Sequence, residues 1–179
     1  MEIMEVNAVV TGGASGLGEA TVRHIVKGGG KAVIFDLNNE RALRLVEELG
    51  EDQVSYMATD VTDAAQVETN IAAAVELLGS INAVINCAGI ATPGKVVSKG
   101  DPLSLETFAK VIQVNLIGSF NVLRVAAAAM QKNLPNEQGE RGVIISTASV
   151  AAYEGQIGQA AYSASKGGVV AMTLPIARE

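Results

Sequence analysis

Five short apolar runs, separated by stretches with helical spacing, constrain the fold of this 179-residue chain more than any other feature. The runs cover residues 8–10, 32–35, 54–57, 81–85 and 142–145. Runs that are this short and apolar on both faces are typical of strands buried in a parallel sheet. Because strands and helices alternate, the crossovers are expected to be right-handed. The sequence therefore predicts an α/β fold with a doubly wound parallel sheet.

The predicted helices lie between and after these runs, at residues 17–27, 38–49, 63–78, 105–132 and from residue 160 onward. Thr62 is the expected N-cap of the third helix, with Asp63 as a first-turn acid, and Ser104 is the expected N-cap of the fourth. Residues 91–104 and 133–141 are predicted surface loops. The whole pattern is typical of a Rossmann-like fold, in which ligands bind at the carboxyl ends of the strands.

Charge and composition exclude several classes of function. The 19 acidic residues outnumber the 13 Lys and Arg residues, so a nucleic-acid backbone or an anionic membrane is not the expected partner. The single cysteine excludes a disulfide framework and a multi-thiolate zinc site, and the single histidine has no partner histidine, so no metal site is expected. We see no signal peptide and no uncharged apolar run of about 18 residues, so we expect no membrane-spanning segment. The expected location is the cytoplasm, or the mitochondrial matrix if the source is eukaryotic.

A glycine-rich turn follows the first predicted strand, where residues 11–18 read T-G-G-A-S-G-L-G. Glycines at this place let the backbone approach a pyrophosphate, whose charge then lies at a helix N-terminus. The spacing G-x-x-x-G-x-G differs from G-x-G-x-x-G, and no Gly-Lys-Ser/Thr follows as in a P-loop. An ordinary glycine turn is the alternative interpretation.

Asp36 ends the second predicted strand, eighteen residues after Gly18. A carboxylate at this place can accept hydrogen bonds from both ribose hydroxyls of an adenosine and would repel a 2′-phosphate. A helix N-cap is the alternative role. Because no Arg or Lys lies near Asp36 before Arg41, the sequence favours NAD over NADP.

Tyr162 and Lys166 are four residues apart in a predicted helix, so they are neighbours on one helix face. At neutral pH a free tyrosine is almost entirely in its phenol form, and only the phenolate form can act as a base. A nearby ammonium favours the phenolate form. Ser149 follows the fifth predicted strand and could hold a substrate oxygen beside the phenol. A surface Tyr and Lys on an amphipathic helix would give the same spacing. The interpretation of Tyr162 and Lys166 as catalytic residues therefore depends on the glycine turn and on Ser149.

Taken together, these motifs resemble the short-chain dehydrogenase/reductase family over essentially the whole chain. The resemblance rests on the glycine turn, on residues 86–89 (N-C-A-G), on Asn115, and on Ser149 with Tyr162-x-x-x-Lys166. Residues 139–178 resemble the branch of type 2 3-hydroxyacyl-CoA dehydrogenases, which oxidise short and branched 3-hydroxyacyl-CoA with NAD. At position 87 many family members have Asn, whereas this chain has Cys87. The type 2 branch also has cysteine at this position.

The resemblance implies roles for individual residues. Tyr162 would be the general acid/base, Ser149 would orient the substrate hydroxyl, Lys166 would bind the nicotinamide ribose, and Asn115 would hold a water at a helix irregularity. The remaining residues expected to bind NAD are Gly12, Ser15, Gly16, Leu17, Gly18, Asp36, Leu37, Asp60, Val61, Asn86, Cys87, Ala88 and Gly89. We read Cys87 as a small residue beside the cofactor, with a reactive thiol as the alternative.

Assembly and truncation are further expectations from the same resemblance. Family members are usually tetramers, and the helices over residues 105–132 and 160–179 are the expected subunit contacts. Five strands are fewer than the six or more of a complete fold. We therefore expect residues 1–179 to be a single dinucleotide-binding domain that lacks its later strands and substrate loop.

Three functions stay open at this point. The main hypothesis is an NAD-dependent oxidation of a 3-hydroxyacyl-CoA. A 3-oxoacyl-carrier-protein reductase or a hydroxysteroid dehydrogenase would use the same residues. A nucleotide-binding or assembly module without turnover is the alternative outside enzymes.

Overall fold

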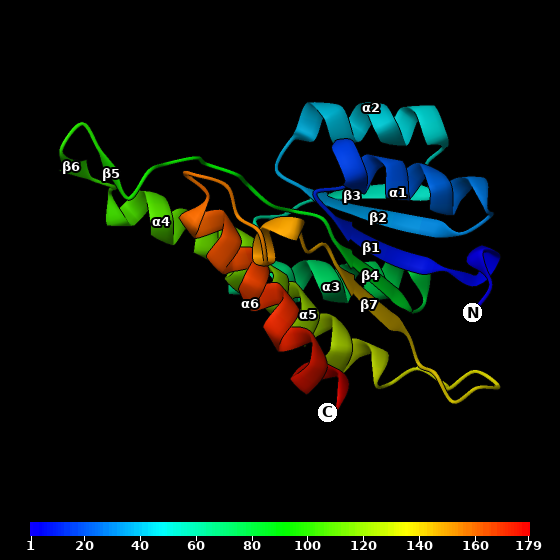
Figure 1. Ribbon diagram of the computed structural model, residues 1–179. Coiled ribbons are helices and arrows are strands. Elements are labelled where there is room, and N and C mark those ends of the chain that lie inside the picture. The colour runs from blue at the N-terminus through cyan, green and yellow to red at the C-terminus, as the bar shows by residue number, and fades with distance from the viewer.

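The computed structural model describes all 179 residues and is built on one five-stranded parallel sheet with the order β3-β2-β1-β4-β7 (Figure 1). The strands are β1 (Asn7–Thr11), β2 (Lys31–Asp36), β3 (Val54–Ala58), β4 (Ala83–Asn86) and β7 (Val143–Ser146). Each predicted strand is found within two residues of its expected ends. The order reverses between β1 and β4, which places the crevice of a doubly wound sheet beside these two strands.

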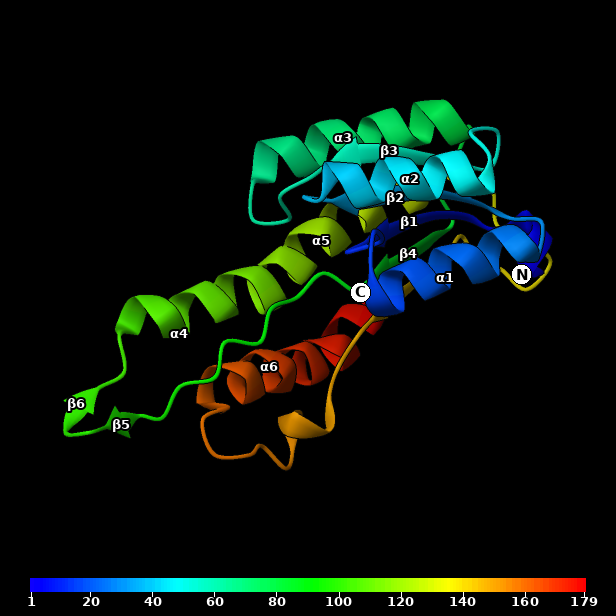
Figure 2. The same cartoon turned by 90° about the horizontal axis from the view of Figure 1, so that it is seen from above.

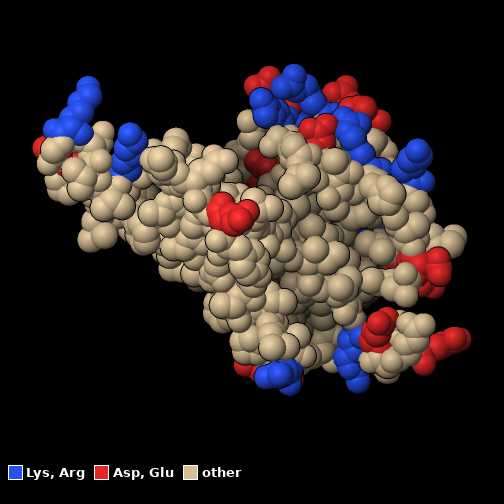
Figure 3. All heavy atoms as spheres, in the orientation of Figure 1, with Lys and Arg blue, Asp and Glu red and all other residues tan.

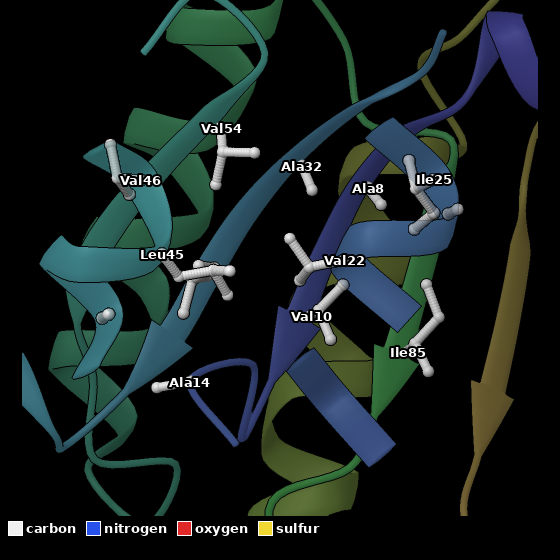
Figure 4. Packing of buried hydrophobic residues seen from close by; sticks show 13 residues of the cluster. Ala8, Val10, Ala14, Val22, Ile25, Ala32, Leu45, Val46, Val54 and Ile85 are labelled. Atoms are coloured by element: carbon white, nitrogen blue, oxygen red, sulfur yellow. The ribbon is translucent and has the colours of Figure 1, made fainter. Parts of the chain in front are cut away.

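Helices cover both faces of the sheet because successive strand residues point to opposite sides. Ala8 and Val10 pack with α1 (Gly16–Lys27) and α2 (Asn39–Leu49), in the apolar cluster of Figure 4. Val9 packs on the other face, with α3 (Ala64–Leu78) and α5 (Gly118–Met130). The predicted Rossmann-like architecture is therefore confirmed.

The predicted helix over residues 105–132 is found as α4 (Leu105–Ile112), a π-turn (Gln113–Ile117) and α5 in one continuous stretch. By length and composition alone this stretch could cross a membrane. Its Val122 and Ala126 are packed in the core, and its Asn115 and Asn121 are hydrogen-bonded within the fold, so we interpret it as a core helix. The last helix, α6 (Ala160–Ala177), lies beside α4 (Figure 2).

Local structure corrects three predictions. The N-cap of α3 is Asp63 and not Thr62, because the Asp63 side chain accepts a hydrogen bond from the Gln66 N–H while Thr62 binds Asp60. Helix α6 ends at Ala177 and does not reach Glu179. Within residues 91–104, predicted as a loop, β5 (Val97–Ser98) and β6 (Asp101–Pro102) form a small antiparallel hairpin.

Strand β7 is an open edge of the sheet, since it pairs with β4 on one side only. The side chains of Val143 and Ile145 are 39% and 52% exposed, whereas strands β1 and β2 are almost wholly buried. The last of the five predicted strands therefore presents apolar side chains and unpaired backbone groups to solvent.

Candidate active site

A pocket of about 490 Å³ opens at the carboxyl ends of β1, β2 and β4, where the strand order reverses. Most of the residues predicted to bind a dinucleotide line it. They are Gly12, Ser15, Gly16, Leu17, Gly18, Asp36, Leu37, Asp60, Val61, Cys87, Ala88 and Gly89. The structure therefore brings together four segments that are far apart in the sequence, residues 12–18, 36–37, 60–61 and 87–89.

The glycine turn has the conformation and the close contacts that only glycine allows. Gly12 has φ +63°, and a Cβ atom on it would lie 2.8 Å from the Ala88 nitrogen. A Cβ atom on Gly18 would lie 2.1 Å from the Gly12 carbonyl oxygen, so the first turn of α1 can pack against the loop only without a side chain. The N-terminus of α1 therefore faces the pocket with backbone close to any bound anion.

Thr11 links the glycine turn to the segment after β4. Its hydroxyl oxygen accepts hydrogen bonds from the backbone N–H groups of Cys87 and Ala88, both at 3.1 Å. Asn86 lies beneath the pocket, only 3% exposed, and its Nδ2 donates to the Ser119 carbonyl oxygen. Asn86 was predicted to touch the cofactor, but it does not line the pocket and instead joins β4 to α5.

Asp36 lies at the end of β2 with each carboxylate oxygen held by one backbone donor. Oδ2 accepts from the Ala14 N–H at 3.0 Å, and Oδ1 accepts from the Asn38 N–H at 2.8 Å. Asn38, and not Asp36, is the N-cap of α2, so the alternative role proposed for Asp36 is not observed. Because a carboxylate oxygen can accept more than one hydrogen bond, Asp36 remains able to bind two hydroxyl groups from the pocket.

Asp60 follows β3 on the far wall of the pocket. Hydrogen bonds from the hydroxyl and the N–H of Thr62 lower the pKa of the Asp60 carboxyl group, and the Lys110 ammonium adds to this effect. Val61, the next residue, is 6% exposed and packs in the core with part of its surface on the pocket. The pocket wall therefore holds two carboxylates, Asp36 and Asp60, with an apolar patch beside the second.

Tyr162 and Lys166 lie on one face of α6, as their spacing predicts. The Lys166 Nζ atom is 5.8 Å from the centre of the Tyr162 ring and donates a hydrogen bond of 2.6 Å to the Thr147 carbonyl oxygen. Lys166 is only 6% exposed, and this burial lowers its pKa, although nearby Cys87 has the opposite effect. Tyr162 is half-buried and therefore partly open to solvent.

Ser149 follows β7 and begins the short helix η3 (Val150–Ala152). Its Oγ accepts a hydrogen bond from the Ala151 N–H at 3.2 Å. No hydrogen bond joins Ser149 to Tyr162, so each hydroxyl keeps its own proton available for a further partner. Helix η3 packs against α6, so Ser149 lies next to the helix that carries Tyr162.

Asn115 lies in the π-turn between α4 and α5, which confirms the helix irregularity that the resemblance implied. Its amide is fully used: Oδ1 accepts from the Ile90 N–H, and Nδ2 donates to the Ile90 carbonyl and to the Ser165 hydroxyl. A Cβ atom on Gly89 would lie 3.2 Å from Asn115 Oδ1 and 3.9 Å from Lys166 Nζ. Gly89 thus borders both the pocket and the buried polar groups behind it.

Sequence reasoning missed several residues of this site. Thr11 fixes two loops, and the Thr147 carbonyl holds Lys166. Lys110 of α4, Val114 of the following π-turn, Phe35, Thr59 and Ile90 also line the pocket. The spacing of Lys110 and Val114, four residues apart, could have placed them on one face, but nothing in the sequence says which face meets the glycine turn.

Another hollow of about 850 Å³ lies near the amino ends of β4 and β7, between the N-terminal segment and residues 132–143. It contains none of the predicted site residues, and its lining is mostly polar and exposed. The structure brings no three His, Cys, Asp or Glu side chains together as a metal site would need. The chemistry of the chain is therefore to be sought in the pocket beside β1 and β4.

Comparison with known proteins agrees with this geometry. The family model described as short chain dehydrogenase matches residues 6–179. The human 3-hydroxyacyl-CoA dehydrogenase type-2 is 51% identical over 174 residues, and the Drosophila melanogaster protein of that name is 47% identical over 174 residues. Ipsdienol dehydrogenase of Ips pini, with another substrate in its name, is 30% identical over 174 residues.

The matches cover most of this chain but only part of each relative. In these three alignments 96% of this chain is covered, whereas the chain spans 66% of the human protein, 68% of the Drosophila protein and 67% of the Ips pini protein. The crystal structure of a 3-hydroxyacyl-CoA dehydrogenase type-2 from Mycobacterium avium matches with a TM-score of 0.90 and 41% identity. That match covers 96% of this chain and 67% of the other.

Proposed function

This chain belongs to the short-chain dehydrogenase family, and we propose that its protein catalyses the reversible, NAD-dependent oxidation of a secondary alcohol. The observation that carries the proposal is the position of the Lys166 ammonium, 5.8 Å from the Tyr162 ring and behind Gly89 at the edge of the pocket. A lysine in this place puts a cationic side chain beside the tyrosine that the proposal makes the acid/base group. A tyrosine that alternates between phenol and phenolate can give and take a proton at a substrate oxygen.

We propose that residues 1–179 act as one dinucleotide-binding domain. The glycine turn fits a diphosphate, because side chains at Gly12 or Gly18 would fill the space that the backbone leaves open. Asp36 fits a ribose diol through its free acceptor positions, and its charge disfavours a 2′-phosphate. These contacts support NAD rather than NADP.

The proposed chemistry assigns one task to each of four polar side chains that do not themselves line the pocket: Ser149, Tyr162, Lys166 and Asn115. Ser149 holds the substrate oxygen, and Tyr162 removes the hydroxyl proton in oxidation or returns it to the carbonyl oxygen in reduction. Lys166 lies beside the Tyr162 ring and is itself positioned by the Thr147 carbonyl. Bound NAD supplies the acceptor for the hydride. Asn115 anchors the turn at Ile90 so that Gly89 stays close to Lys166.

We propose 3-hydroxyacyl-CoA as the substrate class, on the basis of the relatives that carry this activity in their names. The test mixes the protein with NADH and acetoacetyl-CoA and measures the rate at which the absorbance of NADH falls. Turnover with acetoacetyl-CoA and NADH, with less turnover with NADPH, is the expected result. NADH oxidation with a ketosteroid but not with acetoacetyl-CoA would contradict the substrate class while leaving the reaction type intact.

We also propose that the protein assembles as a homotetramer through the stretch from α4 to α5 and through α6. Charged side chains gather over α1 and α2, whereas the face over α5 and α6 is almost free of them (Figure 3). Leu105, Phe120 and Leu174 are exposed on these helices. An apolar, weakly charged face of this kind is typical of subunit contacts. Light scattering coupled to size exclusion measures the mass, and a monomer at all concentrations would contradict this assembly.

A further inference from the structure

Lys110 is the only positively charged side chain that lines the pocket. Its companions on the wall include two carboxylates, Asp36 and Asp60, and otherwise uncharged residues. A dinucleotide brings a diphosphate into a pocket whose fixed side-chain charges, without Lys110, are all negative. Backbone N–H groups at the N-terminus of α1 offset part of this repulsion, but they carry only partial charge.

The position of Lys110 on its helix directs it to the pocket. Val114, four residues later, also lines the pocket, so the two side chains lie on the same face of the continuous stretch formed by α4 and the π-turn. Lys110 is exposed, and its ammonium lies within 4.0 Å of no carboxylate in the chain, because all four ion pairs of the structure involve arginines. A flexible ammonium without an internal partner is available to an incoming anion.

The charge of Lys110 already influences this wall of the pocket. The Asp60 carboxyl group has a lowered pKa, chiefly through its hydrogen bonds from Thr62 and in smaller part through the Lys110 ammonium. Asp60 is therefore within electrostatic reach of Lys110 but does not hold it in a close pair. This arrangement leaves the ammonium free to move toward a ligand between α4 and the glycine turn.

We propose that Lys110 binds the diphosphate of the dinucleotide from the α4 side, opposite the backbone of the glycine turn. The inference rests on the proposed function, since it assumes that a dinucleotide occupies the pocket. It adds a binding residue that none of the sequence motifs marks. NAD without a 2′-phosphate offers the diphosphate as its anionic group, so this is the group that an unpaired ammonium would attract.

The test compares two ligands by calorimetry on the whole chain: ADP-ribose, which contains the diphosphate, and adenosine, which does not. Lys110→Met should weaken ADP-ribose binding roughly fivefold at low salt, as expected for an exposed ion pair, and leave adenosine binding unchanged. The difference in ADP-ribose affinity between wild type and Lys110→Met should shrink at high salt, because the contact between Lys110 and the diphosphate is open to solvent. Lys110→Arg should keep most of the affinity. Lys95→Met is the matched control, since Lys95 is exposed but lies outside the pocket.

Each result separates the possibilities. Equal ADP-ribose affinity in wild type and Lys110→Met would overturn the inference while the proposed function stands. If Lys110→Met lost affinity equally for adenosine and for ADP-ribose, the inference would also be overturned. Lys110 would then affect the adenosine part of the ligand, through Asp60, and not the diphosphate. A wild-type chain that binds neither ADP-ribose nor NAD would overturn the proposed function and this inference with it. Thermal unfolding of each variant shows whether it is folded.

Discussion

At the scale of the residue, Tyr162 is the side chain on which the proposed chemistry depends most directly. Tyr162→Phe keeps the ring, its packing on α6 and its distance from the Lys166 ammonium, but it removes the hydroxyl that exchanges the proton. We expect kcat to fall by about 10²–10⁴-fold, the usual contribution of a general acid or base, with NAD affinity little changed. Steady-state kinetics and calorimetry measure the two quantities. Tyr153→Phe, on an exposed tyrosine of the same region, is the control. Full activity in Tyr162→Phe would exclude the mechanism.

Burial of Lys166 has a consequence for stability that depends on pH. Burial lowers its pKa in the folded state below the ordinary 10.5, so the unfolded chain binds the proton more tightly than the folded one. The charged lysine therefore costs stability at neutral pH, and this cost is lost as the pH rises from the lowered pKa toward 10.5. Lys166→Met removes the dependence. Urea unfolding of both proteins over this pH range should show wild type gaining stability relative to the variant as the pH rises. A constant difference would mean that Lys166 keeps its ordinary pKa.

The sequence predicted Tyr162 and Lys166 as neighbours, but not the group that positions the lysine. Helical spacing determines which residues share a face, and this follows from the sequence alone. The acceptor for Lys166 is the backbone carbonyl of Thr147, which any residue could provide, and its place depends on how β7 approaches α6. In the same way, Asp60 was predicted only from the resemblance, whereas its bonds to Thr62 arise from the turn after β3.

At the scale of the element, two predicted helix starts differ in how their caps are built. The Asp63 side chain accepts a hydrogen bond from the Gln66 N–H at 3.0 Å, whereas Ser104 makes no such bond at the start of α4. Asp63→Ala should lower the free energy of unfolding by about 1 kcal/mol. Ser104→Ala, the matched control, should change it by less than about 0.5 kcal/mol. Chemical denaturation measures both, and equal losses would show that the two caps contribute alike.

The strands and helices were easier to predict than their irregularities. Buried runs and glycine stops identified all five strands of the sheet and the main helices, because burial and helix ends leave a local pattern. The π-turn at Asn115 has no such pattern, since it arises from the fit of Asn115 to the Ile90 backbone and to Ser165. The β5–β6 hairpin was missed because each of its strands has only two residues, too few for any periodicity.

At the scale of the whole molecule, the open edge at β7 is the feature most exposed to association. Val143 and Ile145 present apolar side chains beside unpaired backbone groups, a combination that favours pairing with other chains. Ile145→Lys should reduce the binding of a hydrophobic dye and the light scattering of concentrated solutions. Because Ile145 is half exposed, the free energy of unfolding should change little. If wild type and variant scatter light and bind dye equally, this edge is not the site of association.

The bond between the Asp36 carboxylate and the Ala14 N–H has a consequence for redesign. Asp36 carries the negative charge that opposes a 2′-phosphate, and the same carboxylate gives the backbone of the glycine turn one of its acceptors. Replacing it by a small neutral residue to admit NADP would also release that N–H and loosen the loop that we propose binds the diphosphate. A change of coenzyme in this scaffold is therefore a two-part exchange, in which a new cation must come with a new acceptor for Ala14.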